Sequence, residues 1–128
     1  MLSSEKFSLK WNDFENNIKT SFRELSLDKD FADISLVTED EKMFEVHRVV
    51  LASCSDFFKS ILKKTKHPQP LLLIPGIKSQ FLELALSFIY NGEVNILQDN
   101  LDEFLSLAEK LKLKGLCGMN DKGQNDQK

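Results

Sequence analysis

Hydrophobic and polar residues alternate at the start of the chain and then repeat with a helical period. Residues 7–11 have an apolar side chain at every second position, which is the period of a β-strand with one buried face. The apolar residues that follow are spaced by four, four and three positions, so residues 12–25 predict an amphipathic helix capped by Asn12 or Asp13. The apolar positions of the two segments are Phe7, Leu9, Trp11, Phe14, Ile18, Phe22 and Leu25.

The middle of the chain predicts a β-hairpin followed by two short helices. Apolar and polar residues alternate over 32–37, and a charged stretch separates them from a second strand over 43–47. Residues 49–53 predict a short buried helix, and Ser55 is placed to cap the next one. That helix must end near Lys64, because the prolines that follow remove a backbone donor and restrict the preceding residue.

The remaining elements alternate between strand and helix. Residues 71–74 are apolar throughout, which predicts a strand covered on both faces. Ser79 is expected to cap a helix that stops at Asn91 and Gly92, and a short strand is expected over 93–96. A last helix is expected to start at Asn100. The series predicts one small α/β (α+β) domain over 7–117, with a flexible N-terminus over 1–6 and a polar tail over 118–128 that starts a linker.

Composition adds a hint of association. The chain has 128 residues, 41% hydrophobic and 29% charged, which suits one globular domain. Ten of these residues are Phe, and each ring leaves water only if something covers it. A domain of this size has limited interior, so we expect some rings to lie against another chain.

The charge argues against a nucleic-acid-binding or membrane-spanning chain. The net charge is −3 and the pI is about 5.4, whereas binding to phosphate depends on Lys and Arg. The short basic cluster Lys63, Lys64 and Lys66 has no interleaved aromatic residues and is expected to be a solvated loop. No apolar run reaches the length of a membrane span, and no secretory leader precedes Phe7. Two cysteines, too few for a disulfide framework, favour an intracellular protein.

The sequence offers little material for catalysis or metal binding. The soft or imidazole ligands are Cys54, Cys117, His47 and His67, and no two of them have metal-site spacing. Cys54 and its neighbouring serines have no Gly-rich strand-to-helix turn that would expose a nucleophile. We therefore expect no enzyme activity, no metal and no cofactor, and we expect His47 to be a hydrogen-bonded packing residue.

Three blocks together resemble the BTB/POZ family. The blocks are 33–36 (DISL), 44–58 (FEVHRVVLASCSDFF) and 89–94 (IYNGEV), in the order and spacing of that family. The opening 7–12 (FSLKWN), with 66–68 (KHP) and 113–116 (LKGL), is similar to the Tramtrack group of insect BTB domains.

The resemblance implies a small three-stranded sheet, a helical cluster and a dimer in which the N-terminal strand and helix are exchanged. In that pattern, residues 7–11 of one chain pair with residues 93–96 of the other, so Val94 and Ile96 join the interface. It also places Asp33 and Arg48 in a charged pocket at the dimer groove. The residues alone leave an alternative open to each of these two expectations. The apolar stripe of the helix could pack on its own chain instead of a partner. Instead of forming a charged pocket, Arg48 could reach solvent while Asp33 caps a turn.

The resemblance further implies a module that joins copies of itself, and other Tramtrack-type BTB proteins, in a nuclear transcription or chromatin regulator. Co-regulators are further expected partners, and direct DNA binding is not expected of this domain. Trp11 is either a core residue or part of a contact beyond the dimer. The alternative function is a substrate adaptor for a cullin-type ubiquitin ligase. Such adaptors typically carry a hydrophobic-x-Glu motif before the strand at 71–74, and the loop 63–70 contains no acid.

Overall fold

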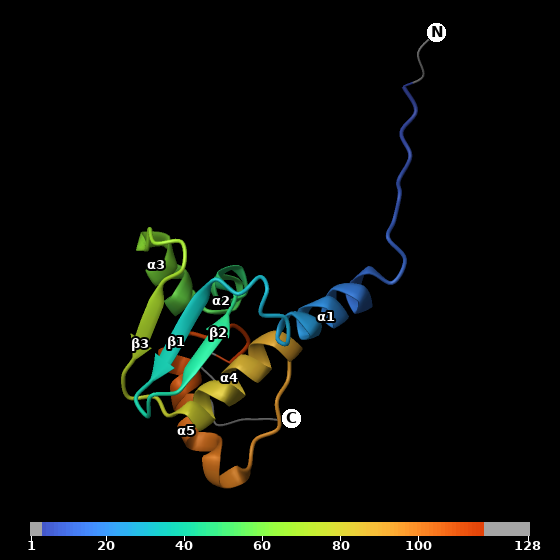
Figure 1. Ribbon diagram of the computed structural model, residues 1–128. Helices are drawn as coiled ribbons and strands as arrows, with labels where there is room; N and C mark the ends of the chain where they lie inside the picture. Colours follow the sequence, from blue (N-terminus) through green and yellow to red (C-terminus); the bar gives the residue numbers. More distant parts are fainter. Residues whose placement is uncertain (1–3, 117–128) are drawn as a thin grey trace.

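The computed structural model describes residues 4–116 and contains one three-stranded sheet. The predicted hairpin is confirmed as β1 (Ile34–Thr38) and β2 (Met43–Val46), which pair antiparallel. The third strand, β3 (Leu71–Ile74), pairs parallel with β1, so the order is β2-β1-β3 (Figure 1). The expected tail and Cys117 lie outside the described residues.

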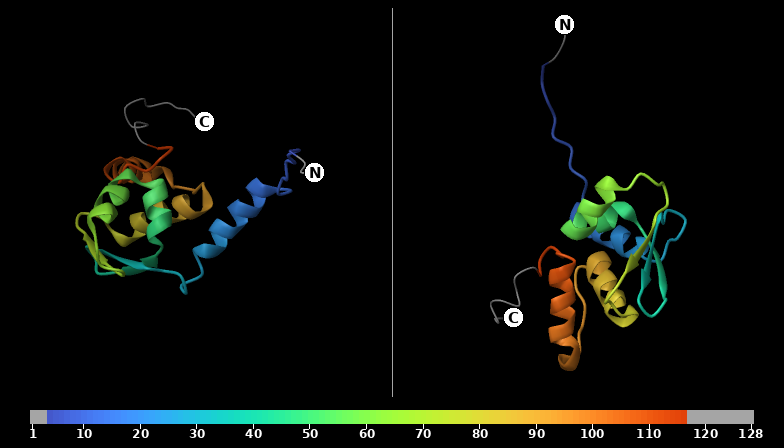
Figure 2. Two further views of the ribbon diagram at one scale, coloured as in Figure 1. Left: turned by 90° about the horizontal axis from the view of Figure 1, so that it is seen from above. Right: turned by 90° about the vertical axis from the view of Figure 1, so that its left-hand side faces the viewer.

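Apart from the first helix, the helices lie on one face of this sheet (Figure 2). The first, α1 (Phe14–Leu25), precedes the sheet, whereas α2 (Arg48–Cys54) and α3 (Asp56–Lys64) connect β2 to β3. The last two are α4 (Ser79–Asn91) and α5 (Gln98–Lys110), and α4 lies between the sheet and α5 (Figure 2). Fully buried side chains from every layer form the core, among them Leu36, Leu51, Phe58, Leu82 and Phe104.

The one-sided arrangement overturns the expectation that residues 71–74 are covered on both faces. Leu72 and Ile74 face the helices, but Leu71 and Leu73 are 53% and 72% exposed. The reason is topological, because the helices cover a single face of the sheet. A short apolar run does not show whether a strand is covered on one face or on both.

The helix ends confirm two predicted caps and correct two others. Ser55 caps α3, since its Oγ accepts from the backbone N–H of Phe58 at 3.1 Å. Gly92 ends α4 in the left-handed conformation, with φ 83°. Ser79 is not the N-cap of α4: Lys78 holds that position, and Ser79 donates from its N–H and hydroxyl to the Asp40 carboxylate. The last helix begins at Gln98, before the expected Asn100.

The segments 7–11 and 93–96 are not strands within the single chain. In the described part of the molecule their backbone groups take part in no sheet, and the opening segment runs away from the domain (Figure 1). The expected pairing of these segments between two chains stays a prediction.

Candidate self-association surface

The N-terminal arm, which comprises residues 4–25, projects from the body of the domain. Helix α1 contacts the domain at its C-terminal end, and residues 4–13 extend beyond its other end (Figures 1 and 2). Asp13 is the N-cap of α1 but bonds the Asn16 side chain at 2.7 Å instead of a backbone N–H. The exposed fractions of the apolar side chains are 83% for Phe7, 93% for Leu9, 58% for Trp11, 50% for Phe14 and 38% for Ile18.

The apolar stripe of α1 is divided between two environments. Phe22 and Leu25, at its C-terminal end, are partly buried and pack against the core of their own chain. The Phe22 ring lies 6.5 Å from the ring of Tyr90 in α4. Phe14 and Ile18, one to two turns earlier, stay exposed. The rings of Trp11 and Phe14 form a T-shaped pair with centroids 5.0 Å apart. The alternative in which the whole stripe packs on its own chain therefore describes only half of it.

The segment after α4 has the exposure pattern of a strand with one covered face. Val94 and Ile96 are partly buried against the core, whereas Glu93, Asn95 and Leu97 are exposed. A groove of about 430 Å³ runs beside it, between the end of α1 and the end of α4. Its lining residues are Arg23, Ser26, Leu27, Ser87, Asn91, Glu93, Val94 and Asn95.

Asp33 and Arg48 are brought together, but through the main chain. The Asp33 Oδ1 accepts from the backbone N–H of Arg48 at 2.7 Å. This N–H belongs to the first turn of α2 and has no partner within the helix, so Asp33 acts as its acceptor. The geometry matches the capping alternative for Asp33. Pairing of its carboxylate with a guanidinium across an interface stays a prediction.

His47 connects three parts of the domain. Its side chain is buried, with Nδ1 at 2.7 Å from the Tyr90 hydroxyl and Nε2 at 3.1 Å from the carbonyl of Asp28. Its backbone N–H also donates to the Tyr90 hydroxyl at 3.1 Å. Burial raises the pKa of Tyr90 to about 12. His47 is the packing residue that the sequence predicted, whereas the role of Tyr90 was missed because its partner is far away in sequence.

The described residues form no cluster of metal ligands. No three His, Cys, Asp or Glu side chains between residues 4 and 116 cluster as metal ligands would. Cys54 is half-buried, and burial raises the pKa of its thiol. Among the helices described, none is long and apolar enough to cross a bilayer.

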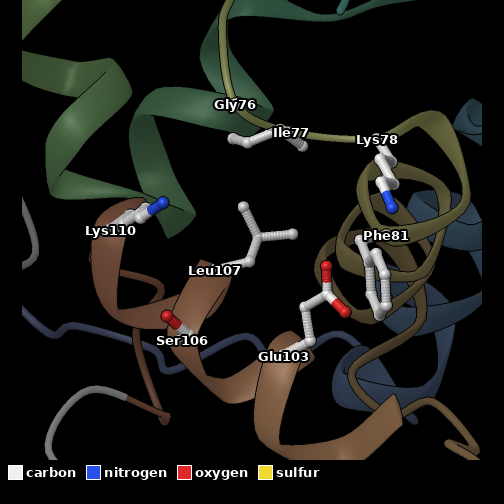
Figure 3. Close-up of a pocket in the computed structure, with 8 residues that line it drawn as sticks. All are labelled: Gly76, Ile77, Lys78, Phe81, Glu103, Ser106, Leu107 and Lys110. Carbon is white, nitrogen blue, oxygen red and sulfur yellow. The ribbon is translucent and has the colours of Figure 1, made fainter. Parts of the chain in front are cut away.

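Two hollows lie away from the N-terminal arm. The smaller, about 70 Å³, has Lys78, Glu103 and Lys110 pointing toward it between α4 and α5 (Figure 3). Its volume has room for a few water molecules and is too small for most substrates. The larger, about 420 Å³, is an apolar groove between α3, β3 and the end of α5, at the opposite end of the molecule from α1. Leu73 lines it, and sequence reasoning had treated that residue as buried.

Other exposed apolar residues were also missed from the sequence. Val49 was expected inside a buried helix but is 70% exposed on α2, and Phe31 and Leu27 are 71% and 84% exposed. Val49 begins the apolar run Val49–Ala52, and no periodicity within that run distinguishes it from Val50 and Leu51, which are buried. Their environment depends on tertiary contacts alone.

Comparison with known proteins places the chain among well-defined relatives. A family model described as BTB/POZ domain matches residues 22–124. Protein abrupt of Drosophila melanogaster is 40% identical over 116 residues, covering 91% of this chain and 13% of that protein. Longitudinals lacking protein-like, of the same organism, is 40% identical over 117 residues, and the match covers 91% of this chain and 91% of that protein. The tramtrack alpha isoform is 31% identical over 120 residues, covering 94% of this chain and 15% of that protein.

Solved structures share the fold. The BTB domain of zebrafish PATZ1 matches with a TM-score of 0.73 and 20% identity, covering 87% of this chain and 91% of that one. The BTB domain of human Gigaxonin matches with a TM-score of 0.76 and 18% identity, covering 95% of this chain and 100% of that one. At these identities the likeness concerns the fold.

Proposed function

The chain belongs to the BTB/POZ family of protein–protein interaction modules, and from this premise we propose that it joins copies of itself within a nuclear transcription or chromatin regulator. The observation that carries the proposal is the projecting arm with its unpartnered apolar side chains. Soluble monomers rarely expose a large contiguous apolar surface, so such a surface commonly marks an interface.

In the proposed dimer, each arm lies against the other copy. Phe14 and Ile18 pack against their equivalents or against the neighbouring body, and the segment 7–11 pairs with 93–96 of the partner. The backbone groups of both segments then gain hydrogen-bond partners. A two-fold axis lets one surface serve both copies. Each large apolar side chain that is covered contributes about 1.5–3 kcal/mol of gross transfer free energy, before the cost of ordering the arm.

The finer parts of the proposal come from the resemblance to the Tramtrack group. They are a charged pocket formed by Asp33 and Arg48 at the dimer groove, association with other Tramtrack-type BTB proteins, assembly beyond the dimer and recruitment of co-regulators. The exposed Trp11 is a suitable residue for contacts beyond the dimer.

A retention experiment with two differently tagged copies tests the proposal. Co-expressed wild-type copies should be retained together on resin that binds one tag. The double variant Phe14→Asp and Ile18→Asp should lose retention, because charges replace the unpartnered apolar side chains. Leu71→Asp with Leu73→Asp is the matched control, with two comparably exposed apolar residues at the other end of the domain. Equal retention of both variants would refute the proposed surface.

A further inference from the structure

The segment after α4 presents a charged outer face to any strand that joins it. Val94 and Ile96 point toward the core of their own chain, so Glu93 and Asn95 lie on the opposite face. Glu93 is exposed, and among the described residues it has no hydrogen bond or ion pair. Its carboxylate is therefore available to a side chain of an added strand.

The opening segment has the complementary pattern. Its apolar row is Phe7, Leu9 and Trp11, and its polar row is Lys6, Ser8 and Lys10. When this segment joins 93–96 of another copy, the apolar row must lie on the same face as Val94 and Ile96. A slip by one residue would turn three large apolar side chains toward water. The polar row thus shares the outer face with Glu93.

The lysines of the opening segment and Glu93 attract each other in every register that keeps the apolar row on the face of Val94 and Ile96. Both charged residues of the polar row are lysines, two positions on either side of Ser8. Neighbouring side chains on a two-stranded face interact when directly opposite and, for long side chains, on the diagonal. Glu93 is therefore opposite or diagonal to a lysine in each such register. Neither Lys6 nor Lys10 has a partner among the described residues of its own chain.

We propose that the pairing of Lys6 and Lys10 of one copy with Glu93 of the other makes the exchanged strand selective for a receiving segment with an acid at this position. The occupant of the groove beside residues 93–95 is the opening strand of a second copy of this chain. The inference rests on the proposed strand exchange and adds to it the residues that select the partner.

Charge reversal on each side separately tests this selectivity. One variant carries Lys6→Glu and Lys10→Glu, the other carries Glu93→Lys, and both are co-expressed so that exchange is complete during folding. Each homodimer then has like charges at both strand pairs, whereas the mixed dimer has opposite charges at both. Native mass spectrometry should show mixed dimer well above the statistical half, with the exchange constant raised on the order of tenfold. The excess should shrink as salt is added.

The matched control reverses the same numbers of charges elsewhere. Lys63→Glu with Lys64→Glu, co-expressed with Glu103→Lys, alters exposed residues of α3 and α5 and should give the statistical mixture. Dimers that form normally but show no preference in the first pair would overturn the charge pairing and leave the proposed self-association intact. A wild-type protein that is monomeric would overturn the proposed function itself. A folding defect in one variant would lower the fraction of mixed dimer, so it could not produce the expected excess.

Discussion

At the residue scale, the hydroxyl of Tyr90 determines how His47 is held. The hydroxyl accepts from the His47 backbone N–H, and its own proton is free for Nδ1 at 2.7 Å. Nε2 then carries the ring proton and donates to the carbonyl of Asp28 at 3.1 Å. This chain of bonds connects α4 to the start of α2 and to the segment that leaves α1, where the arm begins.

Replacing Tyr90 with Phe should destabilise the domain. The ring would remain to pack against Phe22, but two polar groups of buried His47 would lose their partner. A buried group left unsatisfied costs about 1–3 kcal/mol of unfolding free energy. Urea denaturation followed by circular dichroism measures the change. An unchanged midpoint would show that water replaces the hydroxyl.

At the element scale, the hairpin turn between β1 and β2 caps helix α4. Asp40 accepts from the Ser79 N–H at 3.0 Å and from its hydroxyl at 2.6 Å. The hydrogen bond from the Ser79 side chain is the largest cause that lowers the Asp40 pKa to about 2, from 3.8. A carboxylate at a helix N-terminus also meets the positive end of the helix dipole.

The stabilisation from Asp40 should disappear in acid. Since the folded-state pKa lies below the unfolded one, the contribution is complete above pH 3.8 and is lost as the pH falls toward about 2. Asp40→Asn should therefore be less stable than wild type at neutral pH, and the difference should narrow across that window. Urea midpoints measured at several pH values test this, with Glu41→Gln as the neighbouring exposed control. A difference independent of pH would mean that the carboxylate charge is not involved.

Substitutions in helix α1 should have different effects at its two ends. Phe22→Asp should weaken both folding and association, because Phe22 packs against its own core beside Tyr90. Thermal melting and sedimentation measured on the same sample separate the two effects. A Phe22→Asp protein with unchanged mass and unchanged melting temperature would show that this end of the helix supports neither.

Local patterns predicted α1 and the hairpin well, but they also predicted strands over 7–11 and 93–96 that the single chain does not form. Features that depend on distant contacts were not predicted. The helical period over 12–25 and the alternation in the hairpin are local, so both were located correctly. The capping of α4 by Asp40 joins residues 39 positions apart, which no local signal reveals. The division of the α1 stripe, with Phe22 anchored and Ile18 exposed, depends on where the domain ends. Periodicity gives both residues the same face and cannot separate them.

At the scale of the whole molecule, the arm and the apolar groove lie at opposite ends. Self-association through the arm would leave the groove between α3, β3 and α5 free for another partner. The adaptor alternative would use such a partner, but the loop 63–70 lacks the acid that cullin adaptors typically carry. We therefore expect no stable complex when the domain is mixed with purified cullin.

Light scattering coupled to size exclusion, over a concentration series down to the micromolar range, tests most directly whether the arm belongs against a second copy. The account predicts a mass of at least twice the 14.7 kDa of one chain at every concentration in the series. A mass of 14.7 kDa for folded protein throughout the series would contradict it.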